Sequence, residues 1–361
     1  MGQKLKYALV GCGRIAPNHI AAAKECGDIE IAALCDLHRQ KCERLAEQFD
    51  LQGVPLYTDY QEMLEKESPN LVAVATDSGR HAAIALDCIR HHANLIIEKP
   101  IALSLQDADE IIKRAREYNV RVCACHQNRF NKSVTKLKSA IDNDMFGHIY
   151  HLVANVRWNR GEEYYRQAPW RGRWDSDGGA LMNQCIHNID LLRWLSSQRI
   201  LEVFAYTDRL AHPYIQAEDL GIALVKFQKG TYGVIEGTTN IYPKNFEETL
   251  CVFGERGTAK IGGKSVNRIE NFVVAGFEGE ENFIREHYSE TPRDVYGFGH
   301  RPLYRDVVDA IKCDREPLVD AKAGRDALEL VLAIYLSAAE GVPVRLPLKR
   351  CASADFVDRF D

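Results

Sequence analysis

The stretch Val10-Gly11-Cys12-Gly13-Arg14-Ile15-Ala16 follows the apolar run 7–10 and precedes an amphipathic stretch. This order predicts a strand, a tight glycine turn and a helix. Gly11 permits the turn, Gly13 leaves room for a ligand to approach the backbone, and Ala16 lets the helix pack closely on the strand. The first turn of the helix then presents unbonded amide groups, which suit a phosphate.

An acidic residue closes the second apolar run, 31–35. This residue, Asp36, follows Gly13 at close to the ~20-residue spacing of a carboxylate that bonds the adenosine ribose of a dinucleotide. A carboxylate repels a 2′-phosphate, so the pattern predicts NAD rather than NADP. Arg39 is the opposing signal, although a solvated helix residue is the favoured interpretation of it. The alternative for the whole motif is a glycine turn in another kind of α/β protein.

Strands and helices are expected to alternate over residues 1–125. Nearly continuous apolar runs separated by amphipathic stretches are typical of a parallel sheet with helices on both faces. A chain of 361 residues has room for two domains. The expected strands are 7–10, 31–35, 71–75, 95–97 and 120–125, and the expected helices are 17–26, 40–49, 60–66, 81–92 and 105–118.

Residues 126–361 follow another rhythm, in which strands succeed one another after short turns such as Gln228-Lys229-Gly230. Closely spaced strands are typical of antiparallel hairpins. We therefore predict an α+β domain with an open antiparallel sheet and helices on one face. The expected strands are 149–156, 200–207, 221–227, 231–240, 249–254, 258–261, 269–275 and an edge strand 343–346, and the expected helices are 179–195, 303–313 and 323–340.

Two further motifs contain residues suited to acid–base chemistry. Glu98-Lys99-Pro100 directly follows the run 95–97, and the carboxyl end of a parallel strand is where such folds bind ligands. In the stretch 178–190, Asn183, His187 and Asp190 stand three or four residues apart, so a regular helix places them on one face. A lone histidine on an apolar helix is usually structural, but these polar neighbours favour a functional role.

The segment 157–174 lies between the first strand of the second domain and the His187 helix, and it combines arginines with aromatic residues. Arginine binds carboxylates and phosphates bidentately, so the segment is a candidate for holding an anionic substrate. An exposed loop or a subunit interface is an equally good interpretation. Tyr242 stands in a weaker candidate segment, 242–245.

Taken together, the glycine turn, Glu98-Lys99-Pro100 and the helix with His187 resemble the Gfo/Idh/MocA family of sugar and polyol oxidoreductases. The resemblance extends over nearly the whole chain, including residues 305–311. It implies a Rossmann domain over residues 1–125 and an open antiparallel-sheet domain for substrate binding and oligomerisation over residues 126–361. It also implies NAD as cofactor, hydride transfer from a sugar carbon that bears a secondary hydroxyl, and a homodimer or homotetramer.

The resemblance further implies that Lys99 hydrogen-bonds the reacting hydroxyl and that His187 is the acid–base group. Asn183 stands where inositol-type members carry Asp. This segment is similar to the nucleotide-sugar branch, which includes UDP-N-acetyl-glucosaminuronate 3-dehydrogenases. The expected cofactor-binding residues are Gly11, Gly13, Arg14, Ile15, Asp36, Thr76, His81, Glu98, Lys99 and Gln127. The expected substrate-binding residues are Lys99, Asn128, Arg160, Arg166, Trp170, Arg171, Arg173, Asn183, His187 and Tyr242.

Composition narrows the class of protein. The formal net charge is −5, a value that does not by itself attract nucleic acid or an anionic membrane. No apolar run reaches the ~18–20 residues that span a bilayer. The 11 scattered cysteines predict reduced thiols and a cytoplasmic protein. Cys123 and Cys125 lack a second ligand pair at zinc-finger spacing, so the sequence predicts no metal site.

Three functions therefore remain in view. The first is oxidation at C3 of a nucleotide-linked N-acetylhexosaminuronate, with UDP as the expected nucleotide. The second is a myo-inositol or free-sugar dehydrogenase. The third is a non-catalytic NAD(P)-binding sensor or repressor. Asn183 and the arginine-rich segment favour the first over the second. The presence of Lys99 and His187 argues against the third.

Overall fold

The computed structural model describes residues 4–276, 278–292 and 294–361. The chain forms two compact units, one holding residues up to His126 together with 300–325, and the other holding 127–299 together with 326–361. The expectation of a single continuous domain over 126–361 is therefore corrected for residues 300–325. These residues belong to the first unit because Tyr304 of helix α10 (His300–Lys312) is buried there, 2.8 Å from the hydroxyl of Tyr7.

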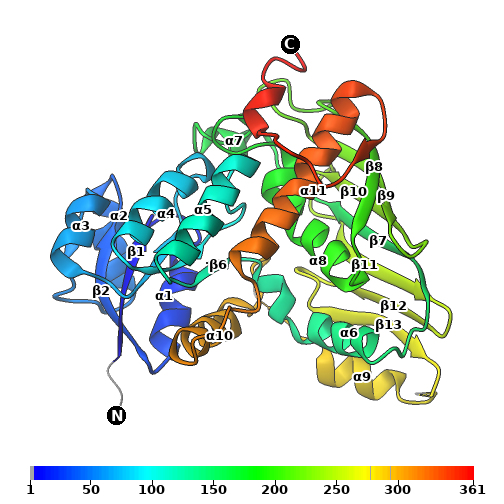
Figure 1. The fold of residues 1–361 in the computed structure, drawn as a ribbon, viewed down its shortest axis with the longest axis horizontal. Coiled ribbons are helices and arrows are strands. Elements are labelled where there is room, and N and C mark those ends of the chain that lie inside the picture. Colours follow the sequence, from blue (N-terminus) through cyan, green and yellow to red (C-terminus); the bar gives the residue numbers. More distant parts are fainter. Residues whose placement is uncertain (1–3, 277, 293) are drawn as a thin grey trace. The chain divides into compact units, whose positions relative to one another are not determined.

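The first unit is a six-stranded parallel sheet in the order β3-β2-β1-β4-β5-β6. This order reverses between β1 and β4, and in doubly wound sheets ligands bind outside such a reversal. Helices flank the sheet (Figure 1). The strands are β1 Leu5–Val10, β2 Ile29–Cys35, β3 Leu56–Tyr57, β4 Leu71–Val74, β5 Asn94–Ile97 and β6 Val122–Ala124, and the helices are α1 Ala16–Glu25, α2 Arg39–Gln48, α3 Tyr60–Glu67, α4 His81–Arg90 and α5 Leu105–Glu117.

The second unit contains an eight-stranded sheet in the order β13-β12-β11-β7-β10-β9-β8-β14. The prediction of an antiparallel sheet needs one correction, because β10 (Tyr232–Thr238) runs parallel to β7 (Ile149–Arg157). A long connection between these strands allows the parallel pairing. The remaining strands are β8 Ile200–Asp208, β9 Leu220–Phe227, β11 Glu247–Gly254, β12 Gly257–Gly262, β13 Arg268–Val274 and β14 Val344–Arg345.

Helices of the second unit include three that the sequence analysis did not predict, namely α6 Lys132–Asp142, α7 Glu162–Arg166 and α9 Glu281–Tyr288. The predicted helix 179–195 is a π-helical turn, Leu181–Cys185, followed by α8 Ile186–Ser196. Helix α11, Ala321–Glu340, follows α10 along the chain. Among the described residues, no helix combines the length and the apolar character that crossing a bilayer requires.

The π-helical turn packs very closely against the sheet. A Cβ built on Gly221 of β9 would lie 2.5 Å from Leu181, and one built on Gly237 of β10 would also lie 2.5 Å from Leu181. Glycines at these two positions therefore let the turn approach the sheet backbone. Because π-turns often occur at functional sites, the packing that fixes this one matters for the residues that follow it.

Glu218, in the chain segment before β9, stabilises the same turn by hydrogen bonds. Its side chain is buried, and its Oε1 accepts hydrogen bonds from the Leu181 amide at 2.8 Å and from the Tyr335 hydroxyl at 2.9 Å. A Cβ on Gly179 would overlap Glu218, at 1.4 Å from Oε2. Burial raises the pKa of Glu218 to about 8, although these two hydrogen bonds favour the ionised form.

We predict that Glu218 gives protein stability a specific pH dependence. The unfolded chain loses this proton near pH 4.5 and the folded chain near pH 8, so between these values the unfolded state binds fewer protons. The free energy of unfolding should therefore fall as pH rises, by up to ~1.4 kcal/mol per pH unit from this group. The Glu218→Gln variant lacks this contribution. Thermal melts at a series of pH values should show wild type losing Tm faster than the variant, and parallel curves would contradict the assignment.

Candidate active site

The glycine turn of the first unit has one glycine that the fold requires and one that it does not. Gly11 has φ +100°, and a Cβ there would lie 2.4 Å from the Ala75 carbonyl oxygen. At Gly13, no atom of the described residues lies within 4 Å of a built Cβ. Neither backbone conformation nor packing explains Gly13, whereas a ligand against the backbone does. Exposed Arg14 and half-buried Ile15 complete the turn.

The first turn of α1 fits an anion beside Gly13. No side-chain hydrogen bond caps the helix at Ile15. The amide groups of a helix N-terminus point along the axis with a partial positive charge, so they bind phosphate readily. The turn therefore fits the pyrophosphate of a dinucleotide.

Asp36 is held beside the same turn. Its Oδ2 accepts a hydrogen bond from the Cys12 amide at 2.9 Å, and its Oδ1 accepts one from the His38 amide at 2.9 Å. These bonds fix the carboxylate at the position from which it would bond a ribose diol. Arg39 bonds Glu43 and the Leu56 carbonyl, in keeping with its interpretation as a helix residue, while Lys41 approaches Asp36 at 3.5 Å.

His81 joins the carboxyl ends of β4 and β5. Its ring is buried, with Nδ1 2.7 Å from the Pro100 carbonyl oxygen and Nε2 3.2 Å from the Thr76 carbonyl oxygen. Burial lowers the pKa of His81, so the ring is neutral at pH 7 and donates to one of the two carbonyls. This contact positions Thr76 and Pro100. A direct contact of Thr76 or His81 with the cofactor stays a prediction.

Glu98 is buried and Lys99 half-buried at the end of β5. The Glu98 carboxylate lies 3.1 Å from His19 Nε2 and accepts a bond from the Lys99 amide at 3.2 Å. Burial opposes its ionisation, but hydrogen bonds and charge from His19 and His300 hold the pKa of Glu98 well below its usual range. Glu98 thus braces the backbone that carries Lys99, and its predicted role in cofactor binding is not tested by this geometry.

In the second unit, His187 lies in the first turn of α8 and is half-buried, as is Asn183 in the π-helical turn before it. His187 and Asp190 both lie in α8, three residues apart, so the expected shared side holds for this pair. The π-helical turn changes only the position of Asn183 relative to them. Asp190 is buried and pairs with Arg129, through Arg129 Nε at 2.7 Å, and this pair anchors α8 to the segment Gln127–Phe130.

Arg160 connects the arginine-rich segment to this helix. Its Nε donates to Gln184 Oε1 at 3.0 Å, and Gln184 in turn donates to Asn183 Oδ1 at 2.8 Å. The guanidinium lies 5.3 Å from the centre of the Tyr164 ring, and that of Arg171 lies 4.0 Å from the same ring. The structure thus brings two predicted arginines and Asn183 together around two residues, Gln184 and Tyr164.

The other arginines of the segment already have acidic partners. Arg157 pairs with Glu236 and Glu247, Arg166 with Glu162, and Arg173 with Asp175. Arg166 and Arg173 nevertheless line a pocket of about 310 Å³ together with Arg171. Trp170 is half-buried with Arg171 over its ring at 5.5 Å, and Tyr242 is 90% exposed.

Gln127 and Asn128 are both buried in the second unit. The Asn128 amide lies 3.5 Å from Glu248 Oε1, and Glu248 is itself buried on β11. Burial raises the pKa of Glu248 to about 8, while the charge of Arg160 acts to lower it. Glu248 is therefore a neutral acid at pH 7, able to donate a hydrogen bond beside Asn128.

Sequence reasoning missed Gln184, Tyr164, Glu218 and Glu248. Gln184 and Tyr164 stood inside quoted motifs, but nothing in their spacing indicated that they join Arg160 to the helix. Glu248 occupies a buried position of an otherwise apolar strand pattern, and a charged residue at such a position was the available signal.

The two glycines of the turn should respond differently to alanine. In Gly11→Ala, the Cβ meets the Ala75 carbonyl at a left-handed φ, so we expect a clear loss of thermal stability. In Gly13→Ala, we expect wild-type Tm but a loss of dinucleotide affinity, because only the ligand occupies that space. Melts and NADH fluorescence titrations measure both effects. Normal NADH binding by Gly13→Ala would show that no ligand contacts this position.

Comparison with known proteins agrees with this geometry. Residues 5–126 match the family described as "Oxidoreductase family, NAD-binding Rossmann fold", and residues 134–260 match the "GFO/IDH/MocA C-terminal domain". The WlbA dehydrogenase of Bordetella pertussis, crystallised with NADH and UDP-GlcNAcA, is 36% identical, with 97% of this chain and 99% of that chain covered and a TM-score of 0.89.

Two further relatives are similar over nearly their whole length. The WlbA dehydrogenase of Chromobacterium violaceum, also solved with NADH and UDP-GlcNAcA, is 34% identical over 97% of this chain and 98% of that chain, with a TM-score of 0.87. The myo-inositol 2-dehydrogenase of Thermotoga maritima is 25% identical over 95% of this chain and 98% of its own length. This chain belongs to the GFO/IDH/MocA family of NAD-dependent oxidoreductases.

Proposed function

We propose that this oxidoreductase removes hydride from C3 of a nucleotide-linked N-acetylhexosaminuronate, with UDP as the nucleotide. The observation that carries the proposal is the pair Arg160 and Arg171, which both pack on Tyr164. Gln184, in the turn that precedes His187, hydrogen-bonds Arg160 and the Tyr164 hydroxyl. A substrate with a diphosphate and a carboxylate needs such cations, because the chain as a whole has a net charge of −5.

The comparisons support the same substrate class. The two WlbA structures contain UDP-GlcNAcA, and each aligns with 97% of this chain. The Thermotoga myo-inositol 2-dehydrogenase supports a different substrate class, an uncharged polyol. Its identity to this chain is lower, at 25%. Asn183 supports the nucleotide sugar over the polyol, because its amide is engaged by Asp177 and Gln184 and cannot accept a proton as Asp would.

The proposed chemistry divides between two side chains. When NAD is bound, its nicotinamide accepts the hydride and its electron pair from the sugar carbon. Lys99 donates a hydrogen bond to the reacting hydroxyl and stabilises the oxygen as its proton leaves. His187 takes that proton, a task that suits an imidazole whose ordinary pKa lies near neutrality. The alcohol thereby becomes a ketone, with the hydride on NAD and the proton on His187.

The roles of Lys99 and His187 predict a defined kinetic phenotype. Lys99→Met and His187→Asn should each lower kcat by ~10²–10⁴-fold, the usual worth of acid–base assistance, while NADH affinity stays near wild type. Steady-state kinetics and NADH titration measure the two quantities. His148→Asn, a change at an exposed histidine of the second unit, is the control and should leave kcat unchanged. A variant that keeps more than a tenth of wild-type kcat would remove that residue from the mechanism.

The substrate proposal predicts which arginines matter most. Arg160→Ala and Arg171→Ala should raise KM for UDP-N-acetylglucosaminuronate about tenfold or more, because a hydrogen bond between ionised groups is worth roughly 1.5–3 kcal/mol. Arg166→Ala and Arg173→Ala should have smaller effects, since their guanidinium groups already bind carboxylates. Arg256→Ala, at an exposed pair with Asp144, is the matched control.

The readout is NADH formation with the UDP-sugar, with myo-inositol and with free hexoses. A preference for myo-inositol or a free hexose would establish the alternative function. If all four loop variants keep the wild-type KM, the segment is an exposed loop or a subunit interface and not a substrate-binding element.

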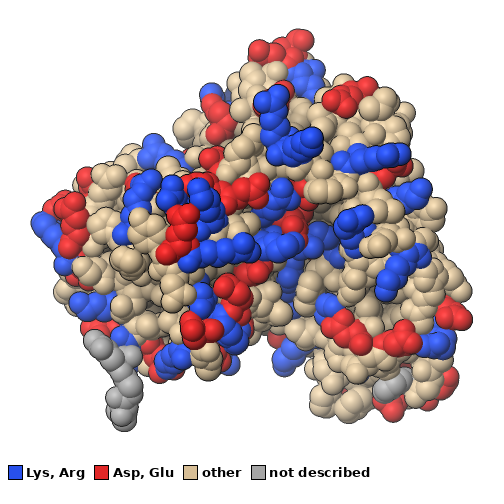
Figure 2. Space-filling model, viewed as in Figure 1, with Lys and Arg blue, Asp and Glu red and all other residues tan. Residues whose placement is uncertain are grey.

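We also propose that the chain assembles as a homodimer or homotetramer in the cytoplasm. The outward face of the eight-stranded sheet carries large exposed side chains on adjacent strands, with Tyr206 70%, Leu224 57% and Tyr232 55% exposed. Exposed apolar patches of this kind mark interaction surfaces. The 11 cysteines all lie among the described residues and none forms a disulfide there, which supports a reducing compartment. Basic and acidic side chains are intermixed on the face shown in Figure 2, which favours no polyanionic partner there.

A further inference from the structure

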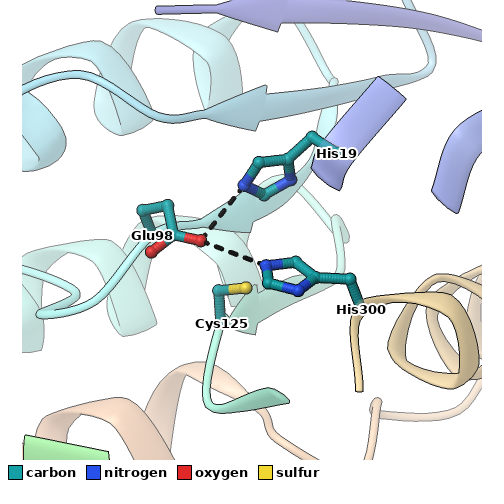
Figure 3. Close-up of side chains that lie close together, drawn as sticks. All are labelled: His19, Glu98, Cys125 and His300. Carbon is teal, nitrogen blue, oxygen red and sulfur yellow. Dashed lines mark hydrogen bonds and ion pairs between the residues drawn. The ribbon is translucent and has the colours of Figure 1, made fainter. Parts of the chain in front are cut away.

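Four side chains of the first unit converge on one point (Figure 3). His19 comes from α1, Glu98 follows β5, Cys125 follows β6, and His300 is the first residue of α10. All four are buried, and one ligand atom of each lies within 4.8 Å of the other three. His19 Nε2 lies 3.1 Å from Glu98 Oε1, and His300 Nε2 lies 3.7 Å from the same oxygen.

The composition of this cluster matches a tetrahedral metal centre. Two imidazoles, a thiol and a carboxylate are ligands that Zn²⁺ takes in proteins, at about 2.0–2.3 Å. Ligand atoms at the corners of such a tetrahedron are separated by about 3.3–3.8 Å, close to the two separations given above. The widest separation, at most 4.8 Å, requires a contraction of about 1 Å. A thiolate and a carboxylate together cancel the charge of a divalent ion, so the buried centre would be neutral.

The surrounding hydrogen bonds hold the ligands as metal sites require. His19 Nδ1 lies 2.7 Å from the Tyr304 hydroxyl, which lies 2.8 Å from the Tyr7 hydroxyl. A ligating histidine is generally fixed by a hydrogen bond at its other nitrogen. This arrangement directs His19 Nε2 to the centre of the cluster. The second carboxylate oxygen of Glu98 is oriented by the Lys99 amide.

The position of the cluster gives the metal a structural task. Cys125 precedes His126, after which the chain leaves the first unit, and His300 is where the chain returns to it. An ion bound here would link the segment at which the chain leaves the first unit to the segment at which it returns. It would also hold both segments to the turn Glu98-Lys99-Pro100. Four protein ligands leave no open position for substrate, which is the mark of a structural rather than a catalytic site.

We propose that His19, Glu98, Cys125 and His300 bind one structural divalent transition metal, with Zn²⁺ the best fit. These four ligands are far apart in the sequence and only the fold brings them together, so their spacing did not predict a metal site. The ion itself would take no part in hydride transfer, although its ligand Glu98 also holds the Lys99 amide. The competing account is a hydrogen-bonded network of Glu98 with His19 and Tyr304 that needs no ion.

Cobalt provides a spectroscopic test. Full-length protein freed of metal with a chelator is titrated with Co²⁺ and then Zn²⁺. We expect one Co²⁺ per chain, with the visible absorption of tetrahedral cobalt, a thiolate charge-transfer band, and displacement by Zn²⁺. Cys125→Ser should lose the charge-transfer band and weaken binding at least ~10-fold. Cys123→Ser, at a buried thiol two residues away, is the control and should retain both.

A second variant and a second readout keep the test decisive. If Cys125→Ser does not fold, His300→Gln takes its place as the test variant. It should also weaken Co²⁺ binding at least ~10-fold. Zn²⁺ should raise the Tm of wild type and of Cys123→Ser but not of Cys125→Ser, since only a ligand that binds the folded state stabilises it. Absence of a stoichiometric Co²⁺ site in wild type, or an unchanged spectrum in Cys125→Ser, would overturn the proposal in favour of the hydrogen-bonded network.

Discussion

The close approach of Gly11 to the carbonyl of Ala75 is the constraint on which the first unit depends. A side chain at Gly11 would separate the end of β1 from the end of β4, the two strands at which the sheet order reverses. With glycine there, the turn places the amide of Cys12 against Asp36 and leaves Gly13 open at the start of α1. Two features that we expect to bind the cofactor, the fixed Asp36 and the open Gly13, therefore depend on one contact between two backbones.

An equally close contact organises the second unit. Leu181 packs against two sheet glycines, and Glu218 holds the same turn by hydrogen bonds to its backbone. The π-helical turn that results shifts the positions of the residues before α8 relative to those within it. Asn183 accepts a hydrogen bond from Gln184, which in turn accepts one from Arg160. Asp190, within α8, is buried and pairs with Arg129.

Much of the fold is local and was predictable from the sequence. The five apolar runs of the parallel sheet and the long strands of the second sheet each have a pattern that can be read within a few residues. Some local elements also escaped prediction, namely the short strand β3 and the helices α6, α7 and α9. The other differences depend on distant partners. The parallel pairing of β7 with β10 and the return of residues 300–325 to the first unit are set by contacts between segments far apart in the sequence.

The candidate site shows the same division. The glycine turn and Asp36 follow from spacing alone, and the structure places them together as expected. The arginine-rich segment could be recognised by composition, but not the finding that Arg157, Arg166 and Arg173 are matched by nearby acids whereas Arg160 and Arg171 stack on Tyr164. The pairs of Arg157 join separate strands and leave no periodic trace in a sequence. Glu162 and Asp175 stand within four residues of Arg166 and Arg173, so their spacing was an available signal.

The central claim is that hydride leaves C3 of a UDP-linked N-acetylhexosaminuronate for NAD. The most direct measurement uses UDP-N-acetylglucosaminuronate with deuterium at C3 and, as its matched control, the same sugar with deuterium at C4. Mass spectrometry of the nicotinamide product follows a single turnover. Our account predicts deuterium in the reduced cofactor from the C3-labelled sugar only. Deuterium from the C4-labelled sugar, or no reduced cofactor from either, would contradict it.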